Sequence, residues 1–360
     1  MIKVRSPKMS GSQDVDSSKH SEYVSAEDLV IRQCEKLGLH EGVDENRDLH
    51  LVVASDCSTA DSITQITERE RHRAFVKAFD RALAKISLDL SSSIEDRTSC
   101  KTNACQSELR ESTTELFSQN QVTGAFPVCA AESYDAAKGT YELSVAVVQS
   151  KKLADIMQSL NSPVGKPGKF SIDAWMENQD VSLLLGVRQF VDDHGERWLV
   201  SFVTDDGSIS EYLRTWVRNT PNAGTFFGDG PEGAGMKNLD EVPVEYLKKM
   251  YCIWQIARSC RCDVRVRQKV FHKSRVDKTA ESESDLDFEE EINVNPSFPS
   301  PFTPNNERLR YFEQKVKSSL SGRPVSVSVY AIRVNDIKKG EREYVSRRQA
   351  ESRKSLDGAK

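Results

Sequence analysis

Residues 224–235 come closest in this sequence to a motif with known chemistry. Residues 228–235 read GDGPEGAG, the letters of a phosphate-cradling loop, in which glycines let backbone N–H groups approach a pyrophosphate at a helix N-terminus. Asp229 and Glu232 would repel phosphate, and Pro231 removes one donor. We therefore predict a flexible glycine loop; the alternative is a small-molecule or enzyme site between residues 224–235 and residues 183–203.

A second group with ligand chemistry contains Cys252, Cys260, Cys262 and His272. These side chains offer four soft ligands to zinc, but structural zinc sites usually have two tight pairs with about two to four intervening residues. Only Cys260 and Cys262 are close, and the single residue between them is too short a spacing. We predict that these cysteines are buried small apolar residues.

His194 is the remaining candidate for acid–base catalysis. It lies beside Asp192 and Asp193 in a predicted turn, but no Ser or Cys nucleophile motif lies near it in the sequence. We interpret it as a solvated turn residue. The sequence thus predicts no catalytic, cofactor-binding or metal-binding residue, and an enzyme is the less favoured interpretation.

A run of basic residues near position 265 is a candidate nucleic-acid patch. Its members are Arg258, Arg261, Arg265, Arg267, Lys269, Lys273 and Arg275. An acidic run at residues 281–291 follows it, and the two runs can neutralise each other. We therefore do not expect nucleic acid as the partner.

The composition excludes several classes of protein. The chain has 360 residues, 38% of them hydrophobic and 29% charged, which is typical of a soluble globular protein of two or three modest domains. A net charge of -5 gives no general attraction to a phosphate backbone or an anionic membrane. No window approaches the roughly 18 apolar residues of a membrane-spanning helix.

The sequence leaves two cellular compartments possible. The first 25 residues lack the apolar stretch of about 7–15 residues of a secretory signal, so we expect the cytoplasm for the sequence as written, and the periplasm or cell envelope if the start is truncated. Eight scattered cysteines suggest no disulfide framework. Cys100 and Cys105 can form a local disulfide after export and are exposed thiols in a reducing compartment.

The first half of the chain predicts helices followed by strands. Residues 1–24 are expected to be a disordered leader, and Ser25 and Gly38 to bound a short helix. A strand is expected at 49–54 and a long amphipathic helix at 63–90. The long helix has an apolar face made by Phe75, Phe79, Ala82, Leu83 and Ile86. A loop over 91–111, a short helix near 109–117, a hairpin of 122–129 with 141–148, and a helix at 151–160 complete this half.

The second half predicts a similar order. A hairpin of residues 183–191 and 197–203 precedes a short helix around Ile209 and Val217. A helix is expected over 244–270, an acidic and Pro-rich linker over 279–305, a helix near 309–320, and a strand at 325–334.

These elements predict an α+β fold of loosely repeated modules, each with antiparallel strands and a long amphipathic helix. We expect a first module at 25–160, a hairpin and glycine-rich middle region at 161–235, and a second module at 236–350, followed by a polar tail at 351–360. The repeat would match residues 63–130 with residues 244–334. Whether it is a true duplication stays open.

Five segments carry a resemblance to an uncharacterised family of bacterial envelope proteins, and more distantly to small outer-membrane lipoprotein modules, including those of flagellar basal structures. The segments are 37–39, the helix sequence at 70–78, the strand entry at 122–124, and residues 141–150 and 186–188. The resemblance covers 26–210 and, more loosely, 240–350. It implies an exported protein and no catalytic residue.

The predicted modules contain no group of polar residues that could form an active site. They therefore favour a structural or assembly protein without enzymatic activity, which binds other proteins or itself through strand edges and helix faces. The alternative is an enzyme or small-molecule binder with a site near residues 224–235. Neither the partner nor the oligomeric state follows from the sequence.

Overall fold

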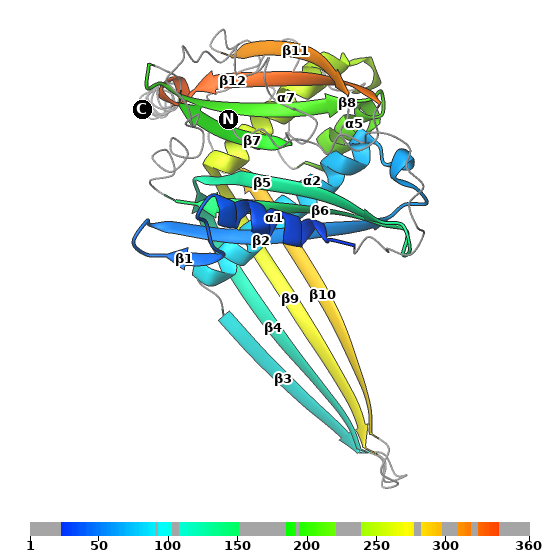
Figure 1. Cartoon of the computed structure of the whole chain (residues 1–360). Helices are drawn as coiled ribbons and strands as arrows, with labels where there is room; N and C mark the ends of the chain where they lie inside the picture. Colours follow the sequence, from blue (N-terminus) through cyan, green and yellow to red (C-terminus); the bar gives the residue numbers. More distant parts are fainter. Residues whose placement is uncertain are drawn as a thin grey trace, which may run out of the picture.

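The computed structural model describes residues 23–90, 93–102, 108–150, 185–191, 194–220, 239–276, 282–296, 309–317 and 323–337 (Figure 1). The protein has an α+β fold, as predicted, in which helices pack on antiparallel sheets. Sheets A and C form a body, and sheet B extends from the body as a narrow projection, which we call the arm.

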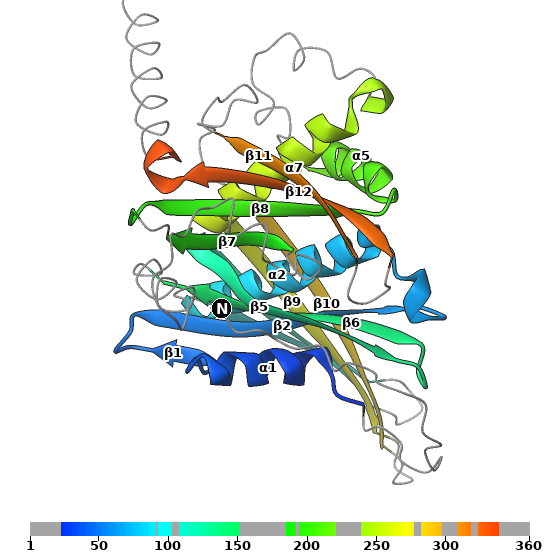
Figure 2. The ribbon, with the colours of Figure 1, turned by 45° about the horizontal axis from the view of Figure 1, so that its top comes forward.

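Sheet A lies between two helices. Its strands have the order β1-β2-β6-β5, with bounds Gly42–Asp44, Leu49–Thr59, Thr140–Gln149 and Ala125–Asp135. Along β2, Leu51 and Val53 join the apolar cluster that includes helix α1 (Ala26–Lys36), whereas Val52 and Ala54 join the cluster of helix α2 (Glu68–Leu90). Because successive strand residues face opposite sides of a sheet, α1 and α2 cover opposite faces (Figure 2).

Helix α1 begins and ends as predicted. The side chain of Ser25 accepts a hydrogen bond from the Asp28 amide, and Gly38 follows the last turn with a positive φ of 68°. Its buried residues Ala26, Val30 and Cys34 recur every four residues and face sheet A.

Helix α2 begins at Glu68, later than the predicted residue 63, and a short 3-10 helix, η1, occupies Ile63–Gln65. Thr67 and Glu70 make a capping box: the Thr67 amide donates to the Glu70 carboxylate at 2.8 Å, and the Glu70 amide donates to the Thr67 hydroxyl at 3.3 Å. The predicted apolar face is buried.

Sheet C has helices on one face and a separate apolar cluster on the other. Its order is β11-β12-β8-β7, with bounds Arg310–Lys317, Pro324–Arg333, Arg197–Asp205 and Gly186–Val191. Helices α5 (Ile209–Asn219) and α7 (Val244–Cys260) share a core with β8 and β12, and η3 (Leu239–Glu241) precedes α7. The hairpins of β7 with β8 and of β5 with β6, the helix at α5 and the strand at β12 confirm four predictions.

The arm is a four-stranded antiparallel sheet of order β10-β9-β4-β3, with bounds Ser282–Pro296, Arg261–Val276, Glu108–Thr123 and Ser93–Thr102. Three predictions are wrong here. The loop and short helix expected over 91–117 are β3 and most of β4; the helix expected to reach residue 270 ends at Cys260, where β9 begins; and the acidic part of the expected linker is β10.

The physical reason for these corrections is that the buried residues recur at every second position, as in a strand, and not at every third or fourth position, as in a helix. In β9, buried Cys262, Val264 and Val266 alternate with exposed residues, which only a strand explains. The helix expected at 309–320 is also wrong, because β11 alternates there, with Phe312 and Val316 packed on sheet C. The predictions for 1–22, for the helix at 151–160, for the loop at 224–235 and for the tail at 351–360 lie outside the described residues.

Candidate interaction surface

Helix α2 fixes the base of the arm by packing on one face of sheet B. Val122 of β4 and Val264 and Val266 of β9 are buried in the same apolar cluster as α2. Two buried serines add hydrogen bonds: the hydroxyls of Ser87 and Ser118 lie 2.7 Å apart, and Ser118 also donates to the Ser87 carbonyl at 3.0 Å. The arm therefore leaves the body in a defined direction.

A glycine makes the corner where the arm strand β4 enters sheet A. Gly124 has a φ of +68°, donates its amide to the Cys260 carbonyl at 3.0 Å, and accepts from the Ser150 amide at 3.3 Å. An added Cβ would meet the Ser150 carbonyl oxygen at 3.0 Å. Only glycine combines this backbone conformation with so close an approach.

An ion pair between buried Arg258 and partly exposed Asp80 ties α7 to α2 directly before β9 begins. The guanidinium of Arg258 pairs with the carboxylate of Asp80 and lies 4.3 Å from the centre of the Trp254 ring and 5.1 Å from that of Phe79. Burial raises the pKa of Asp80 to about 6, although Arg258 acts in the opposite direction. Because Arg258 is 2% exposed, we interpret it as part of the anchor of the arm and not as a nucleic-acid contact.

The opposite face of the arm base is charged. Arg265 and Arg267 of β9 are exposed, and Arg267 lies opposite Glu291 of β10, as Lys269 lies opposite Glu289. Farther out, the same register sets Lys273 opposite Asp285. The pairing of these two strands supports the expected neutralisation of the basic run by the acidic run.

The two outer strands have open edges. In the described part of sheet B, β9 and β4 pair on both sides, whereas β3 and β10 pair on one side only. An unpaired strand edge presents free backbone N–H and C=O groups, which can bind another strand. Phe288 of β10, which is 61% exposed, adds apolar surface beside this edge.

A buried polar network connects α2 to both sheets of the body. Arg71 donates to Glu68 at 2.6 Å and to Glu132 of β5 at 2.6 Å, and the Tyr141 hydroxyl of β6 donates to Glu132 at 2.6 Å. Thr204 of β8 donates its hydroxyl to Glu68. Burial raises the pKa of Glu68 in spite of Arg71, and burial together with Glu132 raises the pKa of Tyr141 well above its usual value.

His72 extends this network toward sheet C. Its Nε2 atom accepts a hydrogen bond from the Thr204 amide at 3.1 Å, and burial, with Arg71, lowers its pKa to about 3. The imidazole is therefore neutral at pH 7. Since His72 and Arg71 are both at most 1% exposed, we interpret the network as a structural connection and not as a catalytic site.

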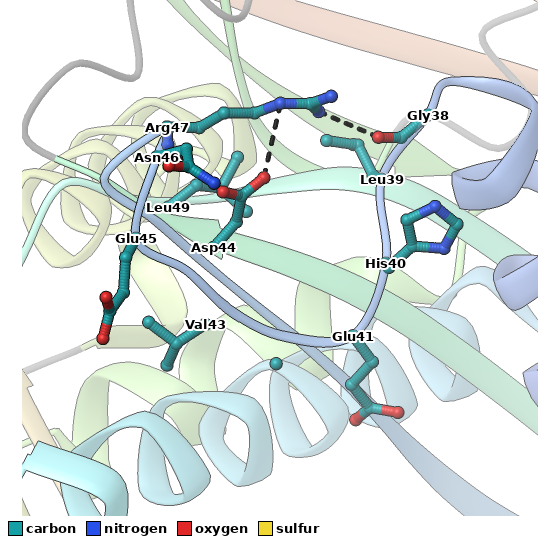
Figure 3. Close-up of a pocket in the computed structure, with 11 residues that line it drawn as sticks. Gly38, Leu39, His40, Glu41, Val43, Asp44, Glu45, Asn46, Arg47 and Leu49 are labelled. Carbon is teal, nitrogen blue, oxygen red and sulfur yellow. Dashed lines mark hydrogen bonds and ion pairs between the residues drawn. The ribbon is translucent and has the colours of Figure 1, made fainter.

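The loop between α1 and β2 borders a surface hollow of about 660 Å³ (Figure 3). Arg47 holds this loop closed: its Nε atom lies 3.4 Å from the Asp44 carboxylate, and its guanidinium donates to the Gly38 carbonyl at 2.8 Å. The side chains of Glu41 and Glu45 are exposed. Contacts between residues of this one loop therefore account for the shape of the hollow.

The candidate residues whose side chains the structure describes do not form a common site. Cys252 and Cys262 are buried in different apolar clusters, as expected of small apolar residues, whereas Cys260 is only partly buried. Burial raises the pKa of the Cys252 and Cys262 thiols to about 12. Among the described residues, no group of three or more His, Cys, Asp or Glu side chains could hold a metal ion. His194 is exposed in its turn. Both the 224–235 loop and Cys105 lie outside the described residues.

None of the described helices has the length and apolar character needed to cross a membrane. No known family model matches the chain, and no curated protein matches it. A comparison with solved structures finds similarity to a hypothetical protein of Francisella tularensis, at 10% identity and a TM-score of 0.37, over 88% of this chain and 93% of that one. A likeness of this size carries no argument about function.

Proposed function

We propose that this chain is a structural or assembly protein without enzymatic activity and that it binds other proteins through its arm. The observation that carries the proposal is the four-stranded sheet that extends beyond the body with an open strand on each side (Figure 1). Sheet edges are a common means of protein association, because backbone hydrogen bonds supply affinity and side chains supply specificity.

The anchoring of the arm supports this role. Its base is held by α2, by the Ser87 and Ser118 hydrogen bonds and by the ion pair of buried Arg258 with Asp80. A rigid projection loses little conformational freedom when it binds, so more of the interaction energy remains as affinity.

We further propose that the chain contains an internal repeat and acts in the bacterial cell envelope. The strand order β1-β2-β6-β5 of sheet A has a counterpart in the order β7-β8-β12-β11 of sheet C. In each case a long helix and one hairpin of the arm lie between the second and third strands along the chain. This agreement supports duplication; the envelope location rests on the sequence resemblance alone.

A variant with a shortened arm tests protein binding. Arg97, Thr113, Phe271 and Asp287 form one cross-strand row. Replacing residues 98–112 and 272–286 each with an Asn-Gly turn would shorten both hairpins at this row without shifting the register. We expect the variant to fold and to lose partners that the wild-type protein captures by affinity purification with mass spectrometry.

The matched control is the variant Thr64→Ala, which changes η1 in the body. This variant should keep both its fold and its capture of partner proteins. Two results would contradict the proposal: a wild-type protein that captures no reproducible partner and is strictly monomeric in scattering, or a shortened variant that captures the same partners equally well.

A further inference from the structure

The two edges of the arm differ in charge, and β10 forms the acidic one. Its Ser282–Pro296 segment contains six carboxylates and no basic residue. Within the part whose side chains are described, Phe288, Glu289, Glu290 and Glu291 are all exposed. The outer edge of β10 therefore combines open backbone groups with negative charge and one large apolar side chain.

Basic residues of β9 lie opposite acidic residues of β10 in the described part of the arm. Lys269 of β9 lies opposite Glu289 of β10. In the neighbouring row on the same face, Arg267 of β9 lies opposite Glu291 of β10. Opposite charges on directly paired residues stabilise a sheet and like charges destabilise it, so the acidic β10 favours a basic strand on its open side, as it pairs with basic residues on its other side.

We propose that the outer edge of β10 binds an extended, lysine- or arginine-rich segment of a partner protein as a fifth strand of the arm. This inference rests on the proposed function and names the partner's chemistry. Basic side chains at every second position would face Glu289 and Glu291, and intervening apolar side chains would cover Phe288.

The charge of β10 argues against the other occupants of this edge. In an antiparallel pairing with β10 of a second copy, carboxylates would lie against carboxylates, and nucleic acid would be repelled. The other edge, β3, has mixed charges: Glu95 and Asp96 against Arg97 and Lys101. Pairing of β3 with β10 of a second copy therefore brings no consistent complementarity.

Synthetic peptides added to the full-length protein test the proposal. The probe is a fluorescent peptide of alternating lysine and valine, about eight residues long, compared with a peptide of alternating glutamate and valine and with a lysine peptide N-methylated on alternate amides. Fluorescence anisotropy should show that the plain lysine peptide binds at least about tenfold more tightly than either control, and more weakly as salt is raised.

Variants locate the binding to β10. The double variant Glu289→Gln/Glu291→Gln should weaken binding of the lysine peptide by about fivefold or more, whereas Glu35→Gln/Glu45→Gln, which removes two exposed carboxylates of the body, should not. Circular dichroism would check that both variants fold.

Three results would each overturn the inference. The lysine and glutamate peptides could bind equally well, the N-methylated peptide could bind as tightly as the plain lysine peptide, or the two double variants could bind the lysine peptide with equal affinity. A second copy as the occupant would appear as concentration-dependent dimers in scattering, which the β10 variant abolishes, and would also overturn it. If these tests fail while the shortened arm still loses its captured partners, the proposed function stands and only the basic partner is wrong.

Discussion

At the scale of single residues, Arg71 has the largest expected effect on stability. Its guanidinium pairs with two buried carboxylates, those of Glu68 and Glu132. Arg71→Met leaves both without a cation, so we expect the free energy of unfolding, measured in urea, to fall by about 3–5 kcal/mol. Arg69→Met is the control: Arg69 pairs with Glu211, and the two side chains are 46% and 73% exposed, so its loss should cost no more than about 1 kcal/mol. Equal losses would contradict the burial argument.

His72 makes a separate, pH-dependent contribution. Its folded-state pKa of about 3 lies below the ordinary value of 6.5, so the stability it contributes is fully present above pH 6.5 and is lost as pH falls toward 3. Relative to His72→Gln, whose amide oxygen can accept the Thr204 hydrogen bond but does not titrate, the wild type should lose about 1.4 kcal/mol per pH unit between pH 6 and 4. The raised pKa of Glu68 acts in the opposite direction in both proteins. A constant difference between them would show that His72 is not buried as a neutral ring.

The sequence did not indicate this network, for a physical reason. Residues 68–73 read ERERHR, which is typical of a solvated helix start. Burial of Arg71 depends on Glu132, 61 residues away, and that of Glu68 on Thr204, 136 residues away. No local pattern encodes such contacts, whereas the isolated Cys252 and Cys262 could be interpreted correctly because they need no partner.

At the scale of elements, the contact of α2 with β7 depends on one glycine. Gly186 has a φ of +77°, and an added Cβ would lie 2.3 Å from the Phe75 ring. Gly186→Ala should cost about 1–2 kcal/mol of backbone strain and about 1–3 kcal/mol of overpacking. Gly195 has a φ of +75° with nothing within 4 Å of the added atom, so Gly195→Ala should cost the strain alone.

Urea unfolding of both glycine variants, alone and in a Phe75→Leu background, separates the two effects. The smaller side chain should restore part of the loss at Gly186 and none at Gly195. An equal loss in the free energy of unfolding at both positions would mean that the Phe75 ring moves away from the added methyl group without cost.

Elements governed by local signals were predictable, and those that depend on distant pairing were not. Capping residues located α1, the spacing of apolar residues located α5, and turn residues located the hairpin of β7 with β8. In the arm, polar β4 is a strand because β9, far along the chain, pairs with it. The alternation Cys262-x-Val264-x-Val266 was a signal for a strand, but it follows directly on helix α7.

At the scale of the whole molecule, the arm was not foreseen, because it joins strands from both halves of the chain into one sheet. Its length is testable by small-angle X-ray scattering. Truncation at the row of Arg97 and Phe271 removes five further residues of β3 and of β9. At about 3.4 Å per residue, the maximum dimension should fall by at least roughly 17 Å. Thr64→Ala should keep the wild-type dimension, whereas an unchanged value in the truncated protein would mean that the arm lies folded against the body in solution.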